Sequence, residues 1–168
     1  MTLDELNRMP PDEAQAELRK CCGAREWAKR LCEARPFSNA NELSAKAEEI
    51  WRGLSESDWL EAFRAHPKIG EKKAETAQTG QAQQWSAQEQ VGAEQAAAET
   101  KAAIAQGNAE YEKRFGFIFI ICATGKPADE ILSLLNQRLH HDPQTELLVA
   151  ADEQRKITQL RLNKLLEN

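Results

Sequence analysis

The chain has 168 residues, a net charge of -5 and 29% charged residues, which together fit one compact globular domain. Its longest apolar run, around residues 115–123, is too short to cross a bilayer, and its 22 basic residues are scattered among acidic ones. These features argue against a membrane protein and against a nucleic-acid partner. No secretory leader and no Ser-Lys-Leu ending is seen, so we expect a cytoplasmic location.

The cysteine pattern does not indicate a disulfide framework or a zinc site. Cys21 and Cys22 are adjacent and cannot easily bridge each other, while Cys32 and Cys122 are isolated. No two Cys-x-x-Cys units occur. We therefore expect four reduced, mostly buried thiols.

The first third of the chain predicts helices with short breaks at Gly23 and Pro36. Thr2 and Glu5 have the spacing of a capping box, in which the threonine hydroxyl and the glutamate carboxylate satisfy free amides at a helix start. Apolar residues between positions 43 and 54 recur every 3.6 residues, as on the buried face of a helix.

The next predicted helix ends beside a histidine. Ser57 can cap a helix that turns Trp59 and Phe63 inward, and Pro67 should end that helix because proline disfavours helical geometry at the preceding residue. His66 is therefore placed at a helix C-terminus. It either caps its own helix or, with its ring oriented by the rigid proline, transfers protons or contacts an anion.

The middle of the chain predicts a loop followed by helices. Residues 71–84 are polar and rich in Ala, Gln, Thr and Gly, which predicts a mobile or partly helical loop, a candidate lid. From Ser86 to Gln106 the alanine- and glutamate-rich composition favours a helix. We expect residues 107–108 (Gly-Asn) to interrupt it before a short helix that ends near residues 115–116.

The last third contains the one strand-like run, residues 117–122. Since no second β-run is available to pair with it, we expect a buried extended segment among helices. Pro127 opens a leucine-rich helix, and Asp142 and Pro143 cap and start a last, long one. The whole pattern predicts an all-α fold, a compact single-domain helical bundle over residues 1–168 with one short extended segment.

Ser86 and Glu89 have two interpretations. Their spacing is that of a capping box, which needs no function. A hydroxyl and a carboxylate beside free backbone amides at a helix start also form a recognition site for a polar small molecule. Both interpretations can hold together.

Arg161 lies four residues from both Ile157 and Leu165, so its guanidinium falls within an apolar stripe of the last helix. Either the side chain reaches out to the surface or pairs with an internal acid, or it awaits the carboxylate of a bound substrate.

The adjacent histidines His140 and His141 do not face the same way on a helix and lack a second set of ligands. We interpret them as a solvated helix end. A metal site that combines one of them with His66 is the alternative.

Five motifs in order resemble the OHCU decarboxylase family, whose name abbreviates 2-oxo-4-hydroxy-4-carboxy-5-ureidoimidazoline. The resemblance covers about residues 20–166. The motifs are Arg35-Pro36-Phe37, His66-Pro67-Lys68-Ile69-Gly70, Ser86-Ala87-Gln88-Glu89-Gln90, residues 111–120 (Tyr-Glu-Lys-Arg-Phe-Gly-Phe-Ile-Phe-Ile) and residues 156–162 (Lys-Ile-Thr-Gln-Leu-Arg-Leu).

The resemblance implies an all-α enzyme, usually a homodimer, that converts OHCU to (S)-allantoin in urate breakdown without a cofactor or a metal. It implies that His66 and Glu89 are catalytic. It also implies that five residues bind the substrate, namely Pro67, Ser86, Glu89, Ile121 and Arg161.

Two other classes of protein compete with this enzyme. A non-enzymatic module that binds a partner through its C-terminal helix would expose an apolar stripe at Leu147, Leu148 and Leu165. A metal-dependent hydrolase would bring His66 together with His140 or His141.

Overall fold

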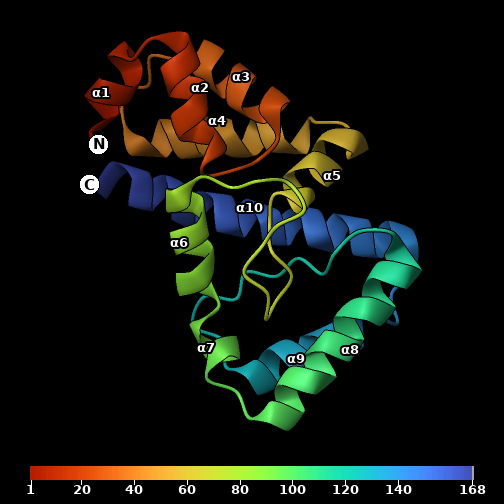
Figure 1. Cartoon of the computed structure of the whole chain (residues 1–168). Coiled ribbons are helices and arrows are strands. Elements are labelled where there is room, and N and C mark those ends of the chain that lie inside the picture. The colour runs from red at the N-terminus through yellow and green to blue at the C-terminus, as the bar shows by residue number, and fades with distance from the viewer. Residues whose placement is uncertain (168) are drawn as a thin grey trace. The chain divides into compact units, whose positions relative to one another are not determined.

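The computed structural model describes residues 1–167, which are all-α, as the sequence predicts. The helices are α1 (Leu3–Arg8), α2 (Pro11–Arg19), α3 (Arg25–Glu33), α4 (Ala40–Arg52), α5 (Glu56–Arg64), α6 (Gly80–Glu89), α7 (Val91–Glu94), α8 (Ala98–Phe115), α9 (Ala128–Arg138) and α10 (Pro143–Glu167) (Figure 1).

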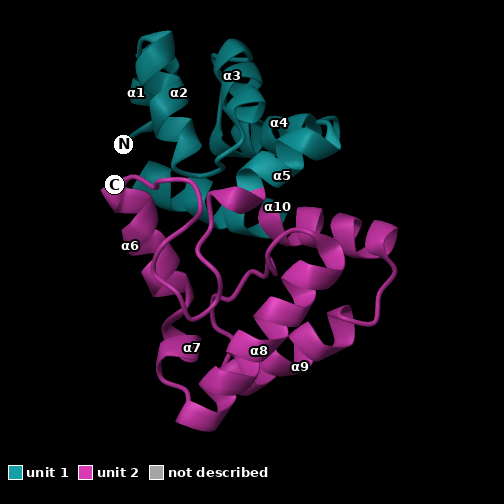
Figure 2. Cartoon of the chain, turned by 45° about the vertical axis from the view of Figure 1, so that its right-hand side comes forward, with its two compact units in different colours: residues 1–62, 155–168 teal, residues 63–154 magenta. Residues whose placement is uncertain are grey.

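The helices form two compact units (Figure 2). Unit 1 consists of residues 1–62 together with the chain from residue 155 onward, and unit 2 consists of residues 63–154. Helix α10 therefore contributes its first half to unit 2 and its second half to unit 1. The expectation of a single domain over the whole chain stays a prediction.

Unit 1 packs α2 against α3 and α3 against α4. Its interior holds Trp27, which is fully buried and donates its indole N–H to the carbonyl of Ala47, 3.1 Å away. The predicted capping box of Thr2 and Glu5 is present at the start of α1. Arg35, from one of the five motifs, donates to two backbone carbonyls of residues 6–9, so this motif has a structural role in unit 1.

Unit 2 is built on α8 and α9, which lie side by side in both views (Figures 1 and 2). Tyr111 of α8 is fully buried and stacks with Phe115, Phe117 and Phe119. The interruption expected at residues 107–108 is wrong, because α8 runs unbroken to Phe115. A Cβ on Gly107 would lie 2.6 Å from a methyl carbon of Leu135, so the glycine serves the packing of α9 and not a break.

Two other expected helix starts are also wrong. Helix α6 begins at Gly80 with Thr79 as its N-cap, which places Ser86 inside the helix and excludes the capping box predicted there. Only residues 71–79 of the predicted loop lack a helix. Helix α5 is capped by Ser55, whose hydroxyl accepts from the amide of Asp58, and not by Ser57.

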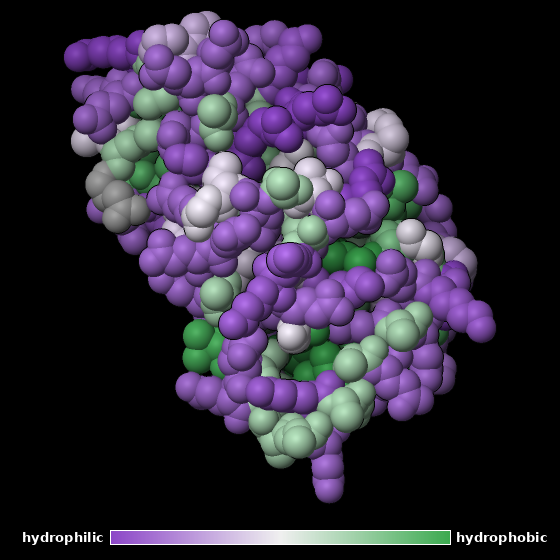
Figure 3. All heavy atoms as spheres, viewed as in Figure 1, coloured by the Kyte–Doolittle hydropathy of each residue, from purple (hydrophilic) through white to green (hydrophobic). Residues whose placement is uncertain are grey.

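The strand-like run is an extended, irregular segment over residues 118–123, as predicted. Within residues 1–167 no helix is long and apolar enough to cross a membrane. The face in Figure 3 is mainly hydrophilic, with the strongly apolar residues seen only in small patches. All four cysteines are free and buried, which confirms the expectation for the thiols.

Candidate active site

His66 lies two residues beyond the end of α5. Its amide donates to the carbonyl of Phe63 at 3.1 Å, and the residue is only 9% exposed. Its Nε2 is 2.6 Å from Oε1 of Gln154, a fully buried residue of α10. Because an amide oxygen can only accept, Nε2 carries the proton of this hydrogen bond, and the bond fixes the plane of the ring.

The backbone after His66 is irregular and is held by side chains from elsewhere in unit 2. Pro67 forms an isolated antiparallel bridge with Ala74. Gly70 has φ +90°, a conformation that L side chains rarely adopt, and its amide donates to Oε1 of Gln90 at 2.9 Å. The turn therefore depends on a glycine and on a buried amide side chain.

Ser86 and Glu89 lie one turn apart on α6. Ser86 is buried, and its hydroxyl accepts from Nε2 of Gln78 at 3.1 Å. Glu89 is the last residue of the helix and is half-buried. The structure therefore places these two predicted residues on one stretch of helix, near its C-terminal end.

The extended segment that contains Ile121 is fixed by charged side chains. Arg138 of α9 donates to the carbonyl of Ile120 at 2.7 Å. The amide of Cys122 donates to a carboxylate oxygen of Glu153 at 3.3 Å, and Lys126 donates to the carbonyl of Cys122 at 2.9 Å. Ile121 itself is buried between these attachment points.

The pKa of the Cys122 thiol depends on burial and on the charged side chains around this segment. Burial raises its pKa, Lys126 opposes the shift, and the carboxylates of Glu153 and Glu89 raise the pKa further. Glu89 and Ile121 both belong to unit 2.

Arg161 belongs to unit 1. It is 3% exposed, which excludes the alternative in which its side chain reaches the surface. One of its guanidinium nitrogens donates to the carbonyl of Lys20 at 3.3 Å, and its charge opposes the burial that raises the pKa of Cys22 to about 12. The two remaining alternatives, an internal partner and a bound substrate carboxylate, both place the cation in the interior.

The two histidines at the end of α9 differ from each other. His140 is exposed, as expected for a solvated helix end. His141 instead has Nδ1 2.8 Å from a carboxylate oxygen of Glu146, which is fully buried and also binds Arg138 and Tyr111. The sequence interpretation missed this network because its members come from three helices.

The rival interpretations find little support in the geometry. Within residues 1–167 no group of three or more His, Cys, Asp or Glu side chains could hold a metal ion. Leu147 and Leu165 are buried, and only Leu148, at 52%, is largely exposed. The C-terminal helix therefore does not present the apolar stripe that a partner-binding module requires.

Comparison with known proteins decides the family. The sequence profile described as OHCU decarboxylase matches residues 7–163, nearly the whole chain. This chain belongs to the OHCU decarboxylase family.

Individual relatives agree with the assignment. A crystal structure of OHCU decarboxylase in the presence of (S)-allantoin is 37% identical, with a TM-score of 0.78, and the match covers 90% of this chain and 98% of that one. The 2-oxo-4-hydroxy-4-carboxy-5-ureidoimidazoline decarboxylase of Haloferax volcanii is 31% identical over 96% of this chain and 94% of its own length. The uric acid degradation bifunctional protein TTL of Arabidopsis thaliana is 36% identical over 95% of this chain, which spans about half (49%) of that protein.

Proposed function

We propose that this protein catalyses the decarboxylation of OHCU to (S)-allantoin, a step of urate breakdown. The observation that carries the proposal is a buried histidine, His66, whose ring is fixed by Gln154 in a chain that matches the OHCU decarboxylase family over residues 7–163. Buried, oriented imidazoles are suited to proton transfer, whereas a histidine that only caps a helix needs no such partner.

The substrate explains why no cofactor is needed in the proposed reaction. The carboxylate leaves from a ring carbon next to an unsaturated carbon–nitrogen bond, which can take up the electron pair of the breaking carbon–carbon bond. The protein then has to orient the carboxylate, stabilise the developing charge and direct a proton to one face of the ring. Proton delivery to a single face accounts for the formation of one enantiomer.

We assign roles to the predicted residues from their chemistry and the family resemblance. His66, positioned by Pro67, acts at the carboxyl-bearing carbon, and Glu89 accepts from the N–H groups of the ureido chain and the ring. The hydroxyl of Ser86 and the backbone at Ile121 bind polar groups of the heterocycle. Arg161, which belongs to unit 1, binds a carbonyl or anionic group of the substrate.

The test is a stereochemical assay with freshly generated OHCU. The wild-type protein should accelerate CO2 loss and yield (S)-allantoin, measured by circular dichroism, whereas racemic product would contradict catalysis. His66→Asn should lower the rate about 10²- to 10⁴-fold, the usual contribution of a general acid or base. Glu89→Gln should also lower it.

The matched control is His140→Asn, because His140 is exposed and outside the proposed site. It should leave both the rate and the product enantiomer unchanged. A folded His66→Asn protein with a near-normal rate would refute the assignment of His66.

We further propose that the protein works as a homodimer in the cytoplasm. The resemblance supports the dimer, and analytical ultracentrifugation of the purified protein tests it.

A further inference from the structure

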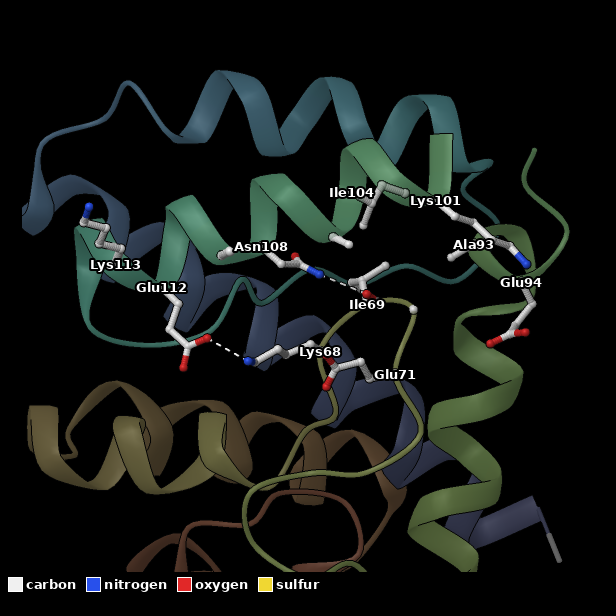
Figure 4. Close-up of a pocket in the computed structure, with 13 residues that line it drawn as sticks. Lys68, Ile69, Glu71, Ala93, Glu94, Lys101, Ile104, Asn108, Glu112 and Lys113 are labelled. Atoms are coloured by element: carbon white, nitrogen blue, oxygen red, sulfur yellow. Dashed lines mark hydrogen bonds and ion pairs between the residues drawn. The ribbon is translucent and has the colours of Figure 1, made fainter. Parts of the chain in front are cut away.

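A cavity of about 530 Å³ lies between residues 68–71 and helix α8, within unit 2 (Figure 4). Ile69 and Gly70 form part of its wall. The side chain of Ile69 is buried in the apolar core of unit 2, together with Ala93 and Ile104. Apolar packing does not satisfy the backbone N–H and C=O groups of this stretch, so these groups need polar partners.

Polar side chains supply such partners. Asn108 of α8 and Ile69 both line the cavity, and Nδ2 of Asn108 donates to the carbonyl of Ile69 at 2.9 Å (Figure 4). One turn further along the same helix, Glu112 forms an ion pair with Lys68 at 2.8 Å, but both of these side chains are partly exposed. Buried hydrogen bonds are less weakened by water than exposed ion pairs are, so the bond from Asn108 is the firmer of the two.

The side-chain amide of Asn108 leaves one of its polar atoms without a hydrogen bond. The residue is 7% exposed, and its Oδ1 is buried without a hydrogen-bond partner among the described residues. Turning the amide over would place that oxygen against the carbonyl of Ile69, so the bond to Ile69 fixes its orientation. An unsatisfied buried oxygen costs free energy, and an apolar residue of similar size would avoid the cost. Stability alone therefore does not explain why an asparagine occupies position 108.

We propose that Asn108 is a positioning residue, which holds the Ile69 carbonyl and thereby sets the placement of His66 for the reaction. The inference rests on the proposed catalytic function of His66. Only Pro67 and Lys68 separate Ile69 from His66, so a shift of the Ile69 carbonyl is passed on to His66 through two residues.

The first test is Asn108→Leu. The adjoining cavity has room for the larger side chain, and the substitution removes both the unsatisfied oxygen and the bond to Ile69. We expect the melting temperature to stay the same or rise, kcat to fall about tenfold or more, and KM to stay within about twofold, because small misplacements of a catalytic group cost rate. If Asn108 had a purely structural role, Asn108→Leu would lower the melting temperature and leave kcat nearly unchanged.

The second test is Asn108→Asp, which can restore the donor. An ionised carboxylate cannot donate to the Ile69 carbonyl, whereas a protonated one can. Burial raises the pKa of such a carboxyl. Acids and bases line the cavity in equal number, so their charges largely offset one another; they are Glu71, Glu94 and Glu112 against Lys68, Lys101 and Lys113. The kcat of this variant, relative to wild type, should therefore rise as the pH is lowered.

A matched control and a readout independent of activity complete the experiment. Gln106→Leu changes an exposed residue of the same helix and should alter nothing. NMR signals of the His66 ring should shift in Asn108→Leu, while those of His140 should not. This readout distinguishes failure of the inference from failure of the proposed function, since it does not require an active wild type.

Two results would overturn the inference. One is an Asn108→Leu protein with wild-type kcat and unshifted His66 signals. The other is an Asn108→Leu protein that melts several degrees lower, together with no recovery of Asn108→Asp at acid pH. If Asn108→Leu does not fold, Asn108→Ala is measured in its place with the same readouts and criteria.

Discussion

Two irregular segments of unit 2 contain proposed site residues, and they are held in different ways. Residues 66–70, with His66 and Pro67, adjoin a cavity, and the backbone at Ile69 and Gly70 forms single hydrogen bonds with the amide side chains of two other residues, Asn108 and Gln90. Residues 118–123, with Ile121, are bound at Ile120 and Cys122 by buried charged groups. We therefore expect the first segment to shift when one of these hydrogen bonds is lost, and the second to shift only when the buried charged groups are disrupted.

The difference predicts where substitutions act. Changes around residues 118–123 should lower the free energy of unfolding, because they leave buried charges without partners. Changes around residues 66–70 should cost less stability and should also alter the rate. The following predictions test this contrast, from the largest expected effect to the smallest.

Arg138→Met should be strongly destabilising. It removes the donor to the Ile120 carbonyl and deprives the fully buried Glu146 of its arginine partner, a change that typically costs about 3–5 kcal/mol. Urea unfolding measures the loss. The double variant Arg138→Met with Glu146→Gln should recover part of it, and Arg64→Met, an exposed arginine of unit 2, should be nearly neutral. A small loss of unfolding free energy in Arg138→Met would contradict the proposed difference between the two segments.

Gly70→Ala should cost about 1–2 kcal/mol, the usual price of a side chain in a left-handed conformation. No atom lies within 4 Å of the added Cβ, so strain in the backbone is the only cause. Gly80→Ala is the matched control, since its Cβ is equally unobstructed and its φ is not positive. Thermal unfolding of both variants checks this, and equal melting temperatures would contradict the role of φ.

Glu112→Gln should have the smallest effect, at most about 0.5 kcal/mol, because the side chains of Lys68 and Glu112 are 35% and 43% exposed. The hydrogen bond that Lys68 donates to Glu112 raises the pKa of Lys68 in the folded protein. The contribution is therefore full below the ordinary lysine pKa and is lost as the pH rises through the raised one. The free energies of unfolding of Glu112→Gln and wild type should differ at neutral pH and become equal at strongly alkaline pH.

Local signals predicted much of the fold. The capping box at Thr2, the helix start at Pro143 and the helix end at Gly116 each depend on residues within one turn of chain, and all three are present. Gly107 was misread because its role depends on Leu135, a residue of another helix. The cap of α6 was misplaced because Ser86 and Glu89 have the right spacing in the wrong part of the helix.

The candidate site was predictable only in part. The family motifs supply the prediction that His66 and two residues of α6 belong to the site, but nothing in the local sequence points to the side chains that contact them. Gln154 lies 88 residues from His66, and Asn108 lies 39 residues from Ile69. Such contacts arise from tertiary packing, so no periodicity or spacing reveals them.

The sharing of α10 between the units has a consequence for synthesis of the chain. Unit 2 is continuous in sequence, but unit 1 needs both the first 62 residues and the second half of α10. Domains usually fold in the order in which they are made, but unit 1 combines the residues made first with those made last, so we expect it to be completed last. Unit 2 can close as soon as residue 154 emerges from the ribosome, and that residue is Gln154, the partner of His66. The histidine would then be oriented before unit 1 is complete.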